Sequence, residues 1–149
     1  MEYMLLPLKR YADFQGRSRR QEFWMFSLFL LIVETVQIFP VMGSLFAAAA
    51  SGQSQNGEFA ATMFSGIGGI MFILLLIFGL AVFIPNLAVQ VRRLHDTDRS
   101  GWWILLGVVP IVNYIGIIVL FVFYCLEGTK GPNRFGPDPK GENYTDVFR

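Results

Sequence analysis

Residues 59–91 read FAATMFSGIGGIMFILLLIFGLAVFIPNLAVQV, and this stretch contains no Asp, Glu, Lys or Arg. A helix needs about 20 apolar residues to cross the ~30 Å hydrocarbon core of a bilayer, so the stretch is long enough. Residues 101–126 are also free of these charges, and residues 23–43 form a further apolar stretch. We therefore predict an all-α integral membrane protein, a single membrane domain over 1–149, with three transmembrane helices at about 23–43, 68–90 and 102–126.

The composition of the 149-residue chain agrees with a lipid environment. Hydrophobic residues make up 54% of it and charged residues only 15%, whereas a soluble domain carries about 25% charged residues. The net charge of +1 argues against bulk attraction to nucleic acid. The single cysteine, Cys125, excludes an internal disulfide and a cysteine-based zinc site. We predict no cofactor, no metal ion and no nucleic-acid partner.

Lys and Arg flank the predicted spans unequally. The loop predicted at 47–58, between the first two spans, has none, whereas the N-terminal flank and the second loop are basic. These basic residues are Lys9, Arg10, Arg17, Arg19 and Arg20 before the first span, and Arg92, Arg93 and Arg99 before the third. Because basic flanks stay in the cytoplasm, the pattern predicts a multi-pass membrane protein with a cytoplasmic N-terminus. Three spans then place the tail, 127–149, outside. A cleavable signal peptide is disfavoured, since the first apolar stretch is too long and contains Glu34.

The third span has an alternative. A break at 110–116, which contains Pro110 and Gly116, would make a re-entrant hairpin and return the tail to the cytoplasm. A turn within lipid leaves amide groups unpaired unless other helices shelter it. The straight or kinked span is therefore the preferred prediction, and the hairpin stays open as the rival.

The basic flanks are candidate lipid or anion sites. Guanidinium groups bind phosphate oxygens, and aromatic residues such as Phe23 and Trp24 favour the membrane interface. The candidate residues are Arg17, Arg19, Arg20, Arg92, Arg93 and Arg99. The competing interpretation is that these arginines only set the membrane topology.

The second loop concentrates charge of both signs with the only histidine. Beside its arginines it contains His95, Asp96, Asp98, Trp102 and Trp103. Charges this close pair locally, and Asp98 or Ser100 is placed to cap the helix that follows. A structural loop is the first interpretation, ahead of an anion site, a metal site and proton transfer by His95. We predict no catalytic residue: a straight third span would put His95 and Cys125 on opposite membrane faces, too far apart for a nucleophile and its base.

Glu34 is the one acidic residue within the predicted spans, and Asn86 and Asn113 in the other two spans are its candidate partners. A carboxylate in hydrocarbon costs about 3 kcal/mol or more, so Glu34 should face protein or water. Interhelical hydrogen bonding by a protonated Glu34 is the first interpretation. Proton or ion handling in an oligomer is the second.

Three separated motifs resemble a known family. They run Phe14-x-Gly16-Arg17-x-Arg19-Arg20-x-Glu22-Phe23-Trp24, then Arg92-Arg93-Leu94-His95-Asp96-x-x-Arg99-Ser100-Gly101-Trp102-Trp103, then Gly128-Thr129-x-Gly131-x-Asn133-x-Phe135-Gly136-x-Asp138-Pro139. Over about residues 8–140 the chain resembles the bacterial inner-membrane domain-of-unknown-function family 805, the YhaH-like proteins. Phe23 departs from the expected tyrosine, and the outer loop near 51–61 is longer. The resemblance implies a small helical protein of the bacterial inner membrane, and it implies no assigned activity.

Together these observations predict a structural or binding role, in which the arginine motifs form a joint cytoplasmic surface that contacts anionic lipid or a partner protein. The alternative is a small oligomeric transporter or channel component that uses Glu34. Membrane lipids are the expected partners, with a homo-oligomer or a second membrane protein as further possibilities.

Overall fold

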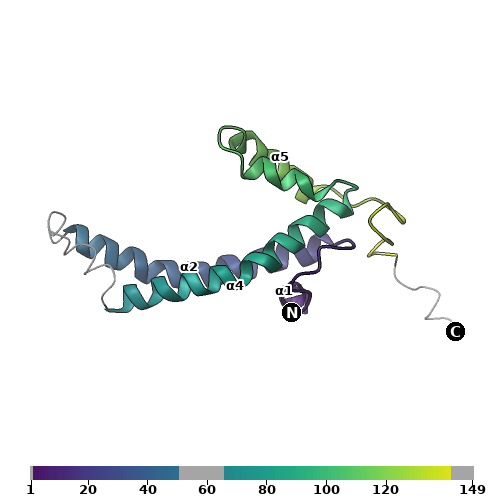
Figure 1. Cartoon of the computed structure of the whole chain (residues 1–149). Coiled ribbons are helices and arrows are strands. Elements are labelled where there is room, and N and C mark those ends of the chain that lie inside the picture. The colour runs from purple at the N-terminus through teal and green to yellow at the C-terminus, as the bar shows by residue number, and fades with distance from the viewer. Residues whose placement is uncertain (1, 51–65, 142–149) are drawn as a thin grey trace. The chain divides into compact units, whose positions relative to one another are not determined.

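The computed structural model describes residues 2–50 and 66–141 and is built from helices (Figure 1). These are α1 (Glu2–Lys9), α2 (Arg20–Ala50), α4 (Gly66–Asp96), the 3-10 helix η1 (Gly101–Gly107) and α5 (Asn113–Cys125). The chain divides into two compact units, one of Met1–Phe26 with Ile84–Arg149 and one of Ser27–Phe83. The all-α prediction is confirmed, and the single membrane domain stays a prediction.

Helices α2 and α4 are long and apolar enough to cross a membrane. Each has 31 residues, or about 46 Å at 1.5 Å per residue. Only 17% of the most apolar window of each helix is buried, and Phe39, for example, is 80% exposed. A core helix of a soluble protein would bury such side chains. The apolar helices predicted at 23–43 and 68–90 are thus confirmed, and their exposed faces suit lipid.

The loop predicted at 47–58 begins too early. Residues 47–50 are alanines that continue α2 to Ala50, because alanine has the highest helix propensity. Residues 51–58 lie outside the described residues.

Within the unit of residues 27–83, α2 and α4 lie side by side (Figure 1). Gly68 of α4 sits so close to Ser44 of α2 that an added Cβ would lie 2.2 Å from the Ser44 hydroxyl oxygen. Small residues permit this approach of two apolar helices.

The straight or kinked third span preferred for 102–126 is wrong. After η1 the chain turns through residues 108–112, and α5 doubles back along η1 (Figure 1). The rings of Trp103 and Phe123 lie 5.3 Å apart, and a Cβ on Gly116 would lie 2.2 Å from the carbonyl oxygen of Leu106. Early residues of the segment therefore contact late ones, as in a hairpin. The 13 residues of α5 span about 20 Å, short of the ~30 Å of hydrocarbon.

Three amides at the turn are hydrogen-bonded, which meets part of the objection to a hairpin. The amides of Val108 and Val109 both donate to the carbonyl of Leu105, at 3.0 Å, and Asn113 donates to Val109 at 2.9 Å. Pro110 lies inside this turn, where a missing amide donor does no harm and its fixed φ disrupts a straight helix. The hairpin, previously the rival interpretation, is the one the structure adopts.

Candidate functional site

Three segments distant in the sequence meet in the unit of residues 1–26 and 84–149. They are the segment before α2, the last turn of α4 and the described part of the tail, residues 127–141. From here on, the tail means these residues. The charged side chains buried where they meet are Arg17, Glu22, Arg92, Arg93 and Asp96, which we call the arginine cluster.

Asp96 joins two of the three arginines through its two carboxylate oxygens. Oδ1 accepts a hydrogen bond from Nε of Arg17 at 3.0 Å, and Oδ2 accepts one from Nη1 of Arg93. None of these side chains is more than 4% exposed. Arg93 also donates to the backbone carbonyls of Tyr124, at 3.2 Å, and Leu126. One carboxylate thus serves two buried guanidinium groups, with carbonyl oxygens as further acceptors.

Arg92 connects α4 to the start of α2. Its Nη2 donates to Oε1 of Glu22 at 3.2 Å, and its Nη1 donates to the carbonyl of Asp13. The amide of Ser18 donates to the carbonyl of Arg92 at 3.1 Å. Nearby, the guanidinium of Arg10 donates to the carboxylate of Asp13 and holds its pKa below the usual value. The segment before α2 is therefore fixed to α4 by side-chain and backbone bonds.

The tail is held by the same cluster. Arg17 donates from Nη1 to the carbonyl of Gly131 at 2.6 Å and from Nη2 to the carbonyl of Thr129. The amide of Thr129 donates to the carbonyl of Asp96 at 2.8 Å. Gly128 passes so close that a Cβ would lie 2.0 Å from Oδ2 of Asp96. A glycine is needed at this position because a side chain would occupy the space of the bridging carboxylate.

His95 also contacts the tail, through its ring and its backbone carbonyl. Its imidazole stacks on the ring of Phe135, with centroids 3.9 Å apart and planes 4° apart. Its Nδ1 lies 3.2 Å from the carbonyl oxygen of Gly16, and its own carbonyl accepts a hydrogen bond from Nδ2 of Asn133 at 2.9 Å. A carbonyl only accepts, so Nδ1 carries the hydrogen and Nε2 is an acceptor in the neutral ring. The structural interpretation of the loop therefore has direct support in these contacts.

Asp138 closes a turn of the tail. Its carboxylate accepts hydrogen bonds from the amides of Lys140 at 2.8 Å and Gly131 at 2.9 Å. These two backbone donors favour the ionised form and hold the pKa of Asp138 below its usual value. The turn thus places a fixed negative charge 4.0 Å from Nη2 of Arg17.

The other three arginines predicted to bind anions are not part of the arginine cluster. Arg19 donates to the carbonyl of Pro139 at 2.6 Å, and the guanidinium of Arg99 lies 4.0 Å from the centre of the Phe123 ring. Arg20 is exposed and makes one side-chain hydrogen bond within residues 2–50 and 66–141, to the carbonyl of Cys125 at 3.4 Å. Arg20 is thus the least engaged of the six, and binding of anions by any of them stays a prediction.

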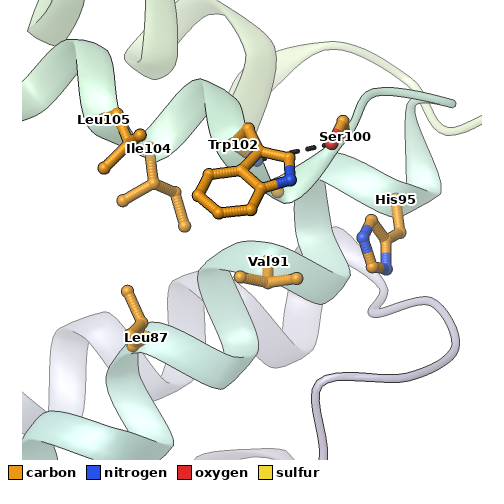
Figure 2. A pocket seen from close by; sticks show the side chains of 8 residues that line it. Leu87, Val91, His95, Ser100, Trp102, Ile104 and Leu105 are labelled. Atoms are coloured by element: carbon orange, nitrogen blue, oxygen red, sulfur yellow. Dashed lines mark hydrogen bonds between the residues drawn. The ribbon is translucent and has the colours of Figure 1, made fainter.

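A pocket of about 370 Å³ opens beside the second loop (Figure 2). Figure 2 shows His95 at one end and Leu87 at the other, with Trp102 above Val91. The oxygen of Ser100 accepts a hydrogen bond from the amide of Trp102 at 3.5 Å, which confirms the predicted cap of the helix that follows. The lining is otherwise apolar, so the loop positions aromatic side chains as well as charges.

Asp98, predicted with the loop residues, lies apart from the cluster. Its carboxylate pairs with Nε of Arg134 at 3.2 Å, and the two side chains are 47% and 61% exposed. Exposed pairs of this kind contribute little to stability. Among the described residues, no three His, Cys, Asp or Glu side chains gather as metal ligands would.

The three polar residues predicted inside the spans have separate surroundings. Glu34 is exposed on α2. Oδ1 of Asn86 accepts a hydrogen bond from Gln90, one turn along α4, at 3.1 Å. Oδ1 of Asn113, at the start of α5, is buried and has no hydrogen-bond partner among the described residues. Pairing of either amide with Glu34 stays a prediction.

The prediction that His95 and Cys125 lie on opposite membrane faces, which excluded them as a base and a nucleophile, is wrong in its premise. It required a straight third span, whereas α5 returns Cys125 to the start of α2, where its carbonyl accepts from Arg20. Among the described residues, the ring of His95 contacts Gly16 and Phe135. Cys125 is exposed. The absence of a catalytic residue stays a prediction.

Sequence reasoning did not single out Glu22, Thr129 or Tyr124 as site residues. Glu22 follows two arginines and begins an apolar stretch, so an acidic residue in the first helical turn was the available signal. Tyr124 had no such signal, because its hydroxyl reaches Gln90, 34 residues earlier, at 3.1 Å. Only the hairpin brings that pair together.

Comparison with known proteins gives the chain its relatives. It is 44% identical over 142 residues to inner membrane protein YhaH of Escherichia coli (strain K12), covering 95% of this chain and 99% of that one. It is 41% identical over 140 residues to inner membrane protein YhaI of the same organism, covering 94% and 97%. No solved structure matches the chain. The family described as protein of unknown function (DUF805) matches residues 11–137, which include the arginine cluster and the hairpin, and the chain belongs to this family.

Proposed function

We propose that the protein is an inner-membrane protein of the binding or structural class that holds anionic phospholipid through Arg20. The observation that carries this proposal is the unequal engagement of the arginines. Arg17, Arg92 and Arg93 are buried among protein acceptors, whereas Arg20 is exposed and, in the part of the chain that the structure describes, makes one long side-chain hydrogen bond. The buried three build the platform, and Arg20 is free to bind phosphate.

The surroundings of Arg20 suit a phospholipid head group. A cavity of about 400 Å³ is lined by Arg20, Gln21, Trp24, Met25 and Cys125. A guanidinium group binds phosphate through two donors, and an indole favours the depth of the head groups. Arg20 also begins α2, where unpaired amides and the helix dipole favour an anion.

The proposed orientation places the arginine cluster in the cytoplasm. The hairpin brings the tail, with Lys130, Arg134 and Lys140, to the side of the basic N-terminal segment, as the bonds from Arg17 and Arg19 to the tail support. The basic residues then gather on one face, and basic flanks stay in the cytoplasm. The N-terminus and the tail are both cytoplasmic in this proposal, which replaces the earlier expectation of an outer tail.

Substituting Arg20 tests the lipid site. We expect Arg20→Gln to reduce the preference for phosphatidylglycerol over phosphatidylcholine by about tenfold. Both lipids have the phosphate, but only phosphatidylglycerol has a net negative charge, and the variant loses the cation that favours it. Native mass spectrometry of the purified protein, equilibrated with both lipids in detergent, measures the retained ratio. Arg134→Gln is the matched control, since Arg134 is an exposed arginine paired with Asp98 in the tail. Equal losses in the two variants would contradict a specific role for Arg20.

Fusions to the C-terminus test the orientation. With a cytoplasmic tail, we expect green fluorescent protein fused after Arg149 to fluoresce and alkaline phosphatase at the same point to be inactive, because the phosphatase folds only outside. An insertion of each reporter after Gly57, in the stretch without Lys or Arg between the first two predicted spans, is the control and should give the reverse pattern. An active phosphatase after Arg149 would return the tail to the outside.

A second candidate function is favoured by the exposure of Glu34. This carboxylate lies within the apolar part of α2 and is exposed, and a charge at the centre of a bilayer costs about 2.5–3.5 kcal/mol. Another copy of the chain or a second membrane protein would relieve that cost. A group of copies around Glu34 could then carry protons or cations.

Liposomes that contain the purified protein test this candidate. We expect a proton flux in the wild type and its loss in Glu34→Gln, which keeps hydrogen-bonding capacity but cannot release a proton. Chemical cross-linking of the same liposomes should give the same oligomer in both proteins. Wild-type flux no greater than that of empty liposomes would reject the transport role.

A further inference from the structure

We propose that the cleft between the hairpin and the start of α2 holds one acyl chain of the phospholipid whose phosphate Arg20 binds. This inference rests on the proposed function and extends it from a head group to a whole lipid. The cleft has a volume of about 370 Å³, within the range of ligand pockets. We call it the chain cleft, and its main walls are Trp24, Gln90, Val108, Ile117, Leu120 and Tyr124.

The hairpin makes the chain cleft apolar along most of its length. Ile117, Leu120 and Phe121 of α5 form one wall, and Val108 lies at the turn. Val108 is 67% and Ile117 56% exposed, whereas Leu120 is buried. The cleft is thus bounded by a packed side chain within and is open at its rim, which suits a flexible chain that enters from the bilayer.

The polar groups of the chain cleft satisfy one another. The hydroxyl of Tyr124 donates to Oε1 of Gln90 at 3.1 Å, and Nε2 of Gln90 donates to Oδ1 of Asn86 at 3.1 Å. A water molecule needs two to four polar partners, and an apolar cavity without them stays dry and accepts apolar guests. An acyl chain therefore fits this cleft better than water or an ion.

Trp24 connects the chain cleft to the head-group cavity. It lines both of them, and its ring lies 5.8 Å from that of Phe121 in an edge-to-face contact. The indole thus borders both the cavity that contains the cation and the apolar cleft. A molecule that fills both must have a negative group and a hydrocarbon chain, which describes an anionic phospholipid.

Tryptophan substitutions in α5 test the chain cleft. Ile117→Trp would fill it from the rim, whereas Ile118→Trp is the matched control, since Ile118 is the next residue, is 64% exposed and is absent from the cleft lining. Because both side chains are exposed, neither substitution should prevent folding, and the melting temperature of each variant in detergent checks this. Native mass spectrometry of the full chain with phosphatidylglycerol measures retained lipid.

We expect Ile117→Trp to retain at least about tenfold less phosphatidylglycerol than the wild type, and Ile118→Trp to match the wild type. In the Arg20→Gln variant the preference for phosphatidylglycerol should fall, while phosphatidylcholine is still retained through its chain. Equal retention by the two tryptophan variants would overturn the chain cleft. If Arg20→Gln alone then lowers the preference, the head-group function survives without the cleft. If Arg20→Gln has no effect while Ile117→Trp releases both lipids equally, the head-group function fails, and the cleft as stated here, with Arg20 as its phosphate site, fails with it.

Discussion

Substituting Asp96 with Asn destabilises the protein by about 3–5 kcal/mol, the cost of breaking a buried ion pair by removing one partner. Asn keeps the shape of the side chain but leaves two buried guanidinium groups, those of Arg17 and Arg93, without their shared carboxylate. Arg17 also holds the tail at Thr129 and Gly131. We therefore expect a lower melting temperature in detergent and faster proteolysis of residues 127–141.

Asp98→Asn is the matched control for this experiment. Asp98 is two residues away and also pairs with an arginine, but both partners are largely exposed, so its loss should change the free energy of unfolding by less than about 1 kcal/mol. Similar melting temperatures for the two variants would mean that burial of Asp96 does not determine its contribution.

Gly116→Ala should open the hairpin. The added Cβ would lie 2.2 Å from the carbonyl oxygen and 2.8 Å from the Cβ of Leu106. The first of these is a backbone atom and cannot move aside as the end of a side chain can, so η1 and α5 must separate. Overpacking of this kind costs about 1–3 kcal/mol. We expect a lower melting temperature and, because the Trp103 ring lies against Phe123, a red-shifted tryptophan emission.

Gly79→Ala is the control for Gly116→Ala. Gly79 lies inside α4, and a Cβ there would meet nothing within 4 Å, so the change should be neutral or stabilising by up to about 1 kcal/mol through helix propensity. If both alanine variants melt alike, the close approach of Gly116 to Leu106 does not hold the hairpin.

In the arginine motifs, the sequence predicted the pairs between neighbouring residues but not the pairs between distant segments. Clustering of Arg92 and Arg93 with Asp96 predicted local pairing, and the structure has that pairing for Arg93. The partner of Arg92 is Glu22, 70 residues earlier, and Asp96 also serves Arg17, 79 residues earlier. Such pairs depend on how helices approach one another, which no local spacing encodes.

By itself, the sequence determined the membrane character of the chain, its two long helices α2 and α4 and the family, since each of these depends on composition, on continuous apolar length or on short motifs. It narrowed the helix cap to Asp98 or Ser100, and the structure has Ser100. The tertiary structure alone decided that the third apolar segment folds back and that three arginines are buried. Length and hydrophobicity are the same for a straight helix and for a hairpin of equal composition. The difference is the close contact of Gly116 with Leu106 and the hydrogen bonds that Arg17 and Arg93 make to carbonyls of the returning chain, and these arise only when distant segments pack together.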